Sequence, residues 1–260
     1  MTAIGADSAG RLAAAPLARL DPRLRIVAAA VLAFAFSAVT QLASLPAMVA
    51  LAAALVAASG LGAAALWWRL RWPGLIVLAL VAVLPVTAGT TPLLQLGPLV
   101  LYQEGLLAAA LIAVRFACIV AVVVALLTTL PVAVLIQAMR ALRVPWLLTD
   151  LALLVLRYLH ELRHALARMR LAMTLRGQPL RGVSPRSLRA WAGLVASLAL
   201  RSHVRADRIY LAMRVRGYGE ELAPPWRFRA TARDWGFLAA VVVAGTLLVV
   251  VDRLGVDRLW

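Results

Sequence analysis

Three residues in the middle of the sequence have the spacing of a zinc protease motif. His160 and His164 stand four residues apart, and Glu161 directly follows the first of them. Because side chains four residues apart share one face of a helix, the two imidazoles could hold zinc while the carboxylate acts as general base. A catalytic zinc needs a third protein ligand, and the one remaining histidine, His203, stands among arginines that disfavour a dication. We therefore expect no metal site and no catalytic residue here, and keep a membrane zinc metalloprotease as the alternative.

A second pattern occurs twice in the sequence, 40 residues apart. Residues 168–177 read R-M-R-L-A-M-T-L-R-G and residues 208–217 read R-I-Y-L-A-M-R-V-R-G, so both have the form R-x-x-L-A-M-x-φ-R-G, in which φ is apolar. The final glycine of each suits the left-handed residue that follows a helix. The arginine before it complements the negative end of the helix dipole. Both segments are therefore predicted to be helix ends.

Capping explains the Arg-Gly pair of each segment but not the identical Leu-Ala-Met one turn earlier. A small and a flexible apolar residue beside a guanidinium group suit an apolar groove with an acidic rim on a partner protein. We therefore predict that both segments dock onto such a partner. The predicted docking residues are Leu175, Arg176, Gly177, Val215, Arg216 and Gly217, with Met173 and Met213 in support.

Two long helices must carry these segments. Apolar residues recur at every third or fourth position over residues 147–173 and again over 191–213, which predicts two amphipathic helices. The second helix is expected to start at Ser184-Pro185, a cap residue followed by proline at the first helical position. A shorter amphipathic helix over residues 131–142 is expected to lie flat on a membrane surface. The apolar stripe of the first long helix consists of Leu147, Leu151, Leu154, Tyr158, Leu162, Ala165, Met169 and Met173.

Composition places much of the remaining chain in a lipid bilayer. A hydrophobic content of 64%, a mean hydropathy of +0.91 and only 15% charged residues exclude an ordinary soluble fold. A spanning helix needs about 20 apolar residues, and about 17 are tolerated. The predicted spans are residues 26–39, 45–66, 72–88, 105–130 and 235–251. The predicted fold class is thus an all-α membrane protein with about five transmembrane helices, and the two long cytoplasmic helices lie between the fourth and fifth spans.

The charged residues indicate the orientation of these spans. All 27 basic residues are arginines: four precede the first span, Arg69 and Arg71 lie between the second and third, and 18 lie in residues 131–234. The positive-inside rule therefore predicts a multi-pass protein of the cell (inner) membrane with a cytoplasmic N-terminus. Asp252 and Arg253 cancel at the external C-terminal end, and the connection 85–104, rich in turn-forming residues, is expected to be an ordered external loop or a re-entrant stretch. The predicted parts are a cytoplasmic segment 1–25, four spans in 26–130, a cytoplasmic segment 131–234, and a last span with the external C-terminus in 235–260.

A stand-alone permease and a nucleic-acid-binding protein are the two other classes of function to weigh. A stand-alone permease needs ionisable groups at mid-membrane, and Arg115, ten residues into the fourth span, is the one candidate. Arg115 is either a substrate or coupling residue or an arginine paired inside the bundle. Nucleic-acid binding is not expected, because the arginines follow the topology and no aromatic residues are interleaved with them for stacking.

The paired Arg-Gly ends resemble a known family, the transmembrane T component of energy-coupling factor (ECF) transporters of the cobalt CbiQ type. Two coupling helices of that family each end in Ala-Arg-Gly, and here Leu175 and Val215 replace both alanines, a departure that could alter the fit to an ATPase. The resemblance extends from about Leu20 to Gly219. Further similar positions include Asp21-Pro22-Arg23, Leu96-Gly97-Pro98, Thr128-Thr129, Arg157-Tyr158-x-His160 and Arg205-Ala206-Asp207-Arg208.

This resemblance implies a non-catalytic subunit of an ATP-driven importer. Its partners would be two cytosolic ATPase subunits, a separate substrate-binding membrane S component, and the lipid bilayer. The chain itself would need no cofactor. The resemblance favours cobalt as the transported substrate, and nickel or a vitamin stays open because the S component selects the cargo.

Overall fold

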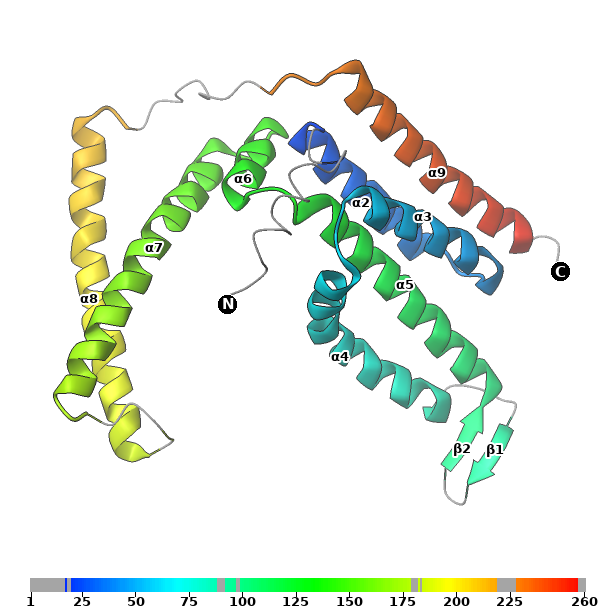
Figure 1. Ribbon diagram of the computed structural model, residues 1–260, viewed down its shortest axis with the longest axis horizontal. Helices are drawn as coiled ribbons and strands as arrows, with labels where there is room; N and C mark the ends of the chain where they lie inside the picture. The colour runs from blue at the N-terminus through cyan, green and yellow to red at the C-terminus, as the bar shows by residue number, and fades with distance from the viewer. Residues whose placement is uncertain are drawn as a thin grey trace. The chain divides into compact units, whose positions relative to one another are not determined.

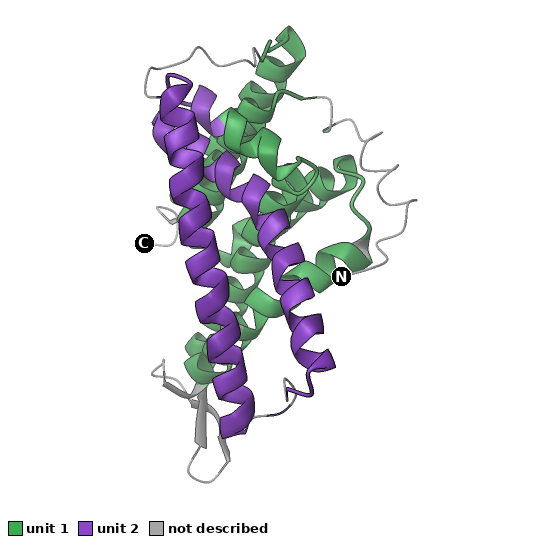
Figure 2. Ribbon diagram, turned by 90° about the vertical axis from the view of Figure 1, so that its left-hand side faces the viewer, with its two compact units in different colours: residues 1–138, 228–260 green, residues 139–227 purple. Residues whose placement is uncertain are grey.

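The computed structural model describes residues 17, 20–87, 92–96, 99–178, 182, 184–218 and 228–256. The chain divides into two compact units, residues 1–138 with 228–260 and residues 139–227 (Figure 2). Unit 1 contains α2 (Pro22–Ala38), η2 (Leu42–Ser44), α3 (Leu45–Ala58), α4 (Ala63–Thr87), β1 (Pro92–Leu96), β2 (Leu99–Tyr102), α5 (Gln103–Leu127) and α9 (Ala232–Val256). Unit 2 contains α7 (Trp146–Leu175) and α8 (Pro185–Val215), and α6 (Val132–Ala141) crosses the boundary between the units.

The core of unit 1 lies around α2. This helix packs against both α5 and α9, while α3 and α4 pack against α5 (Figure 1). Leu32 and Phe36 of α2 and Val122 of α5 are fully buried in this core. The α2 and α9 backbones come close, since a Cβ atom added at Gly245 would lie 3.2 Å from the Cβ of Ala35. Unit 1 is therefore a helix bundle with α2 at its centre.

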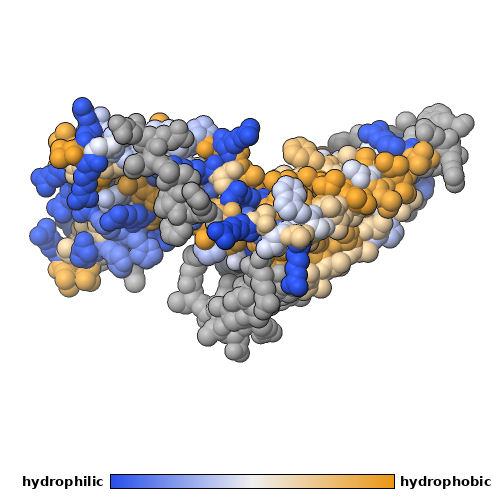
Figure 3. Space-filling model, turned by 90° about the horizontal axis from the view of Figure 1, so that it is seen from above, coloured by the Kyte–Doolittle hydropathy of each residue, from blue (hydrophilic) through white to orange (hydrophobic). Residues whose placement is uncertain are grey.

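Large apolar side chains also cover the outside of unit 1. Figure 3 shows hydrophobic residues spread over the helices of this unit on the face in view. Phe34 is 79% exposed, and Trp67, Leu78 and Leu247 are each more than half exposed. A soluble monomer rarely exposes so much apolar surface, whereas helices that face lipid do so as a rule. The structure thus agrees with the composition that the chain is a membrane protein.

Two described helices are long and apolar enough to cross a membrane on their own. They are α5 over Gln103–Leu127 and α9 over Ala232–Leu254, which confirms the long apolar helices predicted at 105–130 and 235–251. A third candidate is the bent pair Ala64–Leu75 and Val77–Pro85 within α4. Helices α2 and α3, with 17 and 14 residues, are shorter than the ~20 residues of a typical span. The total of five spans therefore stays a prediction.

The predicted second span, residues 45–66, is wrong in its boundaries. Helix α3 ends just before Gly60, whose φ of +68° takes the chain out of the helix, and α4 begins three residues later. Arg69 and Arg71, expected in a connection, lie inside α4. Helix α4 bends by 54° between Leu75 and Val77, shortly after Pro73 and Gly74. Glycine, and not the arginine pair, thus separates the two helices.

One antiparallel hairpin interrupts the helical fold. Strands β1 and β2 pair with Gln95 opposite Val100 and Leu96 opposite Leu99. This hairpin occupies the connection predicted to be an ordered loop or a re-entrant stretch, and its Gly97-Pro98 corner lies outside the described residues. Apart from the hairpin, the predicted all-α class is confirmed for the residues that the structure describes.

A buried carboxylate joins the end of α9 to the turn after α2. Asp252 is 1% exposed and accepts hydrogen bonds from the backbone N–H groups of Thr40, at 2.9 Å, and of Gln41, at 3.1 Å. The hydroxyl groups of Thr40 and Ser44 also donate to it. Burying a carboxylate is tolerated only where several donors satisfy its oxygens, as they do here. The main partners of Asp252 are therefore in this turn, and it is not simply a surface charge that balances Arg253.

Unit 2 contains the two long helices that the apolar periodicity predicts. Helices α7 and α8 run antiparallel, since the ring of Trp146 at the start of α7 lies 6.0 Å from that of Tyr218, just after α8. Further along the pair, Arg205 of α8 forms an ion pair with Glu161 of α7. The predicted start of α8 is confirmed by a capping box in which the Ser184 hydroxyl accepts from the backbone N–H of Ser187 at 3.2 Å.

Candidate docking site at the two helix tips

The two repeated segments end their helices with the same backbone geometry. In α7 the N–H of Gly177 donates to the carbonyl of Thr174 at 3.1 Å, and the N–H of Gln178 donates to that of Met173 at 3.0 Å. In α8 the corresponding bonds join Gly217 to Arg214 and Tyr218 to Met213, both at 3.0 Å. This pair of bonds defines the Schellman motif, which requires a left-handed residue after the helix. Gly177 and Gly217 supply it, with φ values of +72° and +77°.

The arginine at each tip is held in nearly the same conformation. Arg176 has φ −85° and ψ 9°, and Arg216 has φ −88° and ψ 11°. Both side chains are exposed, and neither guanidinium forms an ion pair within the described part of the chain. Each tip therefore presents an unpaired positive charge on a rigid backbone turn.

An apolar side chain stands next to each arginine and is almost fully exposed. Leu175 is 80% exposed and Val215 is 89% exposed, values that contrast with the usual burial of such residues. One turn earlier, Leu171 and Leu211 are each 60% exposed. These two leucines were not among the predicted docking residues, although their identical place in the repeat was the signal that could have identified them. Each tip thus combines exposed apolar surface with one cation.

The two methionines that were predicted to support docking are less exposed than the residues at the tips. Met173 and Met213 are half-buried, and Met173 lines a groove between α7 and α8. Their backbone carbonyls accept the Schellman hydrogen bond that spans five residues, from Gln178 and Tyr218 respectively. Within unit 2 they contribute to the position of each tip more than to its exposed surface.

The antiparallel arrangement places the two tips at opposite ends of the helix pair. Arg176 lies at the end of α7 where α8 begins, and Arg216 lies near the start of α7. Helix α8 has 31 residues and is therefore about 45 Å long at 1.5 Å per residue. One small groove therefore cannot receive both tips.

The residues of the zinc protease motif do not form a metal site. The rings of His160 and His164 lie 5.8 Å apart in an edge-on arrangement, and both side chains are exposed. Glu161 is occupied by its ion pair with Arg205, and His203 lies 3.7 Å from Asp207. Among the described residues, no group of three or more histidine, cysteine, aspartate or glutamate side chains could hold a metal. Within the described residues the motif therefore has no third ligand of the kind that a catalytic zinc needs.

We expect the purified chain to hold no stoichiometric zinc and Glu161→Gln to leave transport nearly unchanged. Among the described residues this carboxylate pairs with the exposed Arg205, and such surface ion pairs contribute only about 0.2–1 kcal/mol. Elemental analysis of the isolated protein tests the first point, with His203→Ala as a matched control. About one zinc per chain, lost in His160→Ala but kept in His203→Ala, would establish the metalloprotease interpretation instead.

Two arginines of unit 1 are used inside the bundle. Arg115 is partly buried and donates to the backbone carbonyl of Val39, which favours the paired interpretation over a substrate site. Arg25 is fully buried and donates to the carbonyl of Leu126 and the hydroxyl of Thr129, at the end of α5. The sequence suggested only that Arg25 flanks the first span; the structure places it inside the bundle.

Comparison with known proteins agrees with these observations. The family described as cobalt transport protein, CbiQ, matches residues 13–226, which include both long helices and both tips. A protein of Bifidobacterium longum (strain NCC 2705) that is named as an ABC transporter ATP-binding protein is 29% identical over 238 residues. Those residues make up 86% of this chain and 30% of that protein, so the chain spans less than a third of the relative's length. The extent of the family match leads to one conclusion: the chain belongs to the CbiQ family of cobalt transport proteins.

Proposed function

We propose that this membrane protein is the transmembrane energy-coupling (T) subunit of an ECF-type ABC importer. It links cytosolic ATPases to a substrate-binding membrane subunit and has no catalytic residue of its own. The observation that carries the proposal is the duplicated tip, with the same Schellman turn, a free arginine and an exposed apolar residue at Leu175 and Val215. A helix that only ends in solvent gains nothing from such apolar exposure.

Two further observations support ATPases as the docking partners. The chain contains no lysine, so it cannot provide the lysine with which a Walker A loop holds nucleotide phosphates. The Bifidobacterium longum relative is named for ATP binding, and the region similar to this chain occupies 30% of it. That relative, named as an ATP-binding protein, therefore contains a segment similar to this chain in the same polypeptide. In the complex that we propose, the ATPases are subunits that bind the two tips.

The tips transmit movement because their contacts with the ATPases differ between the open and the closed state. When two ATPases close on ATP, the sites that hold Arg176 and Arg216 move relative to each other, and a tip can follow only if its contacts are kept. Because α7 and α8 are long and continuous, a shift at a tip is carried along the helix to the apolar stripe over residues 147–162. The S component rests against that stripe, tilts with it and releases its cargo to the cytoplasm.

The remaining assignments follow from the same proposal. The chain crosses the cell membrane five times with its N-terminus in the cytoplasm, and the segment 131–234 carries the coupling helices on that side. The cargo is cobalt, with nickel or a vitamin as the alternatives that the S component would decide. Arg69 and Arg71, at the bent start of α4, still lie near one end of a candidate span, which is compatible with this orientation.

Co-purification tests the proposal directly. The tagged chain is expressed in the cells from which it comes, extracted in detergent and captured. We expect an ATPase pair and a second membrane protein to elute with it, and the reconstituted complex to take up Co²⁺ in preference to Ni²⁺ only when ATP is present. Elution of a folded chain without any ATPase would contradict the proposed subunit role.

A further inference from the structure

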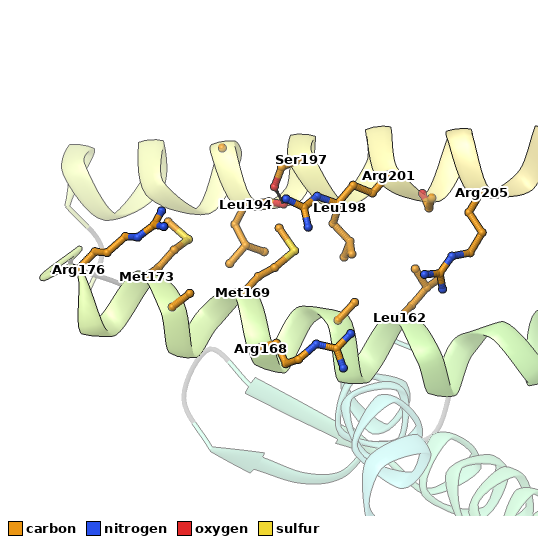
Figure 4. Close-up of a pocket in the computed structure, with 14 residues that line it drawn as sticks. Leu162, Arg168, Met169, Met173, Arg176, Leu194, Ser197, Leu198, Arg201 and Arg205 are labelled. Atoms are coloured by element: carbon orange, nitrogen blue, oxygen red, sulfur yellow. Dashed lines mark hydrogen bonds between the residues drawn. The ribbon is translucent and has the colours of Figure 1, made fainter.

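Helices α7 and α8 form a groove of about 500 Å³, and Arg176 of one tip is among the residues that line it (Figure 4). Its floor is apolar and comes from both helices. Leu194 is 1% exposed, and the methionines at the floor are half-buried. The main apolar floor residues are Leu162, Met169 and Met173 of α7 with Leu194 and Leu198 of α8. Methionine side chains are flexible and polarisable, which suits a floor that must fit a chain of variable shape.

The rim of the same groove is strongly basic. Arg168 and Arg176 reach it from α7, and Arg201 and Arg205 reach it from α8 (Figure 4). None of the described residues that line the groove is acidic. Arg205 is paired with Glu161 at the edge, while Arg168 and Arg201 form no ion pair in the described part of the chain. Two guanidinium groups on facing helices are therefore available to an anion.

The size of the groove decides what kind of anion fits. One turn of a helix, about 10 Å wide and 5.4 Å long, already occupies roughly 400 Å³, so most of a docked peptide helix would lie outside the groove. A volume of about 500 Å³ is instead that of a typical small-molecule site. The occupant must carry an oxyanion for the arginines and a hydrocarbon segment for the floor. Arginine is the preferred partner of phosphate, because its planar group donates two parallel hydrogen bonds.

We propose that this groove binds one anionic phospholipid. The phosphate lies between Arg168 and Arg201, and the first part of an acyl chain lies on Met169, Leu194 and Leu198. A membrane source agrees with the first half of α7, where Leu147, Leu148, Leu151 and Val155 are all exposed. A soluble phosphate would satisfy the arginines and leave the apolar floor uncovered. The inference does not depend on the proposed subunit role, since it concerns unit 2 and a lipid alone.

Native mass spectrometry of the full chain in mild detergent tests the lipid site. Phosphatidylglycerol is titrated against the wild type, the double variant Arg168→Gln/Arg201→Gln and the control Arg163→Gln/Arg186→Gln. The control removes two exposed arginines from the same helices, outside the groove, and so has the same net charge as the groove variant. We expect binding to weaken at least about tenfold in the groove variant and to stay within about twofold of wild type in the control.

Two comparison ligands show whether the site needs both the anionic headgroup and the acyl chain. Phosphatidylcholine carries the same acyl chains with a neutral headgroup, and inorganic phosphate carries the anion without a chain. We expect both to bind at least about tenfold more weakly than phosphatidylglycerol. Met169→Asp, which places a negative charge on the floor while all rim arginines stay, should weaken phosphatidylglycerol binding as much as the double variant does. Equal binding of phosphatidylglycerol and phosphatidylcholine, equal loss in the control, competition by equimolar inorganic phosphate, or unaltered binding by Met169→Asp would each overturn the site.

Discussion

Arg176→Glu or Arg216→Glu is expected to abolish ATP-driven uptake, and the double variant is expected also to release the ATPases from the membrane. Each guanidinium is exposed and unpaired within the described residues, so its charge is available to acidic side chains of a partner. Reversing a charge that docks against carboxylates replaces attraction with repulsion, which costs several kcal/mol, about 2–5, where the pair is desolvated. Uptake into cells and fractionation of membranes measure the two effects.

Arg214→Glu is the matched control for this experiment. Arg214 lies in the last turn of α8, two residues before Arg216, and is also exposed, so its reversal disturbs the helix dipole in a similar way. It is not part of the repeated signature, because the equivalent position in α7 is Thr174. We expect Arg214→Glu to keep most of the uptake. Full uptake by both single tip variants, or equal loss in the control, would reduce the tips to well-capped helix ends.

The local geometry of the tips could be predicted from sequence because it depends on neighbouring residues alone. A glycine after an arginine at the end of an amphipathic stripe is enough to predict the left-handed residue found at Gly177 and Gly217. The exposure of Leu171 and Leu211 could not be predicted in this way. Whether an apolar residue on a helix is buried depends on the neighbouring helix, and the α7 side of the groove faces α8 through Met169 and Met173 instead.

The same distinction explains the fold. The helix predicted over 131–142 is found at Val132–Ala141, and the start at Ser184 is confirmed, since both depend on local patterns. Hydropathy alone joined α3 to the first part of α4, because the link at residues 59–62 is short and carries no charge. The inward place of Arg25 depends on Leu126, 101 residues away, and no local pattern reports such a contact.

Asp252→Ala is expected to be the most destabilising single change in unit 1. It would remove the acceptor of the Thr40 and Gln41 N–H groups and of the Ser44 hydroxyl, in a place where Asp252 itself is 1% exposed. Each buried donor left without a partner costs about 1–3 kcal/mol, so a loss of roughly 3 kcal/mol or more is expected even if water reaches part of the turn. Thermal unfolding in detergent, followed by tryptophan fluorescence, measures it as a large fall in Tm.

Two variants distinguish this hydrogen-bonded role from a general effect of charge. Arg253→Ala changes the exposed neighbour by one charge and should leave Tm within a few degrees of the wild type. Asp252→Asn keeps the side-chain carbonyl oxygen but replaces the second acceptor with an NH₂ donor, so its loss should fall between those of the other two variants. Because the contact joins residues 211 positions apart, a fall in Tm for Asp252→Ala no larger than that for Arg253→Ala would show that α9 is held by its apolar face on α2 alone.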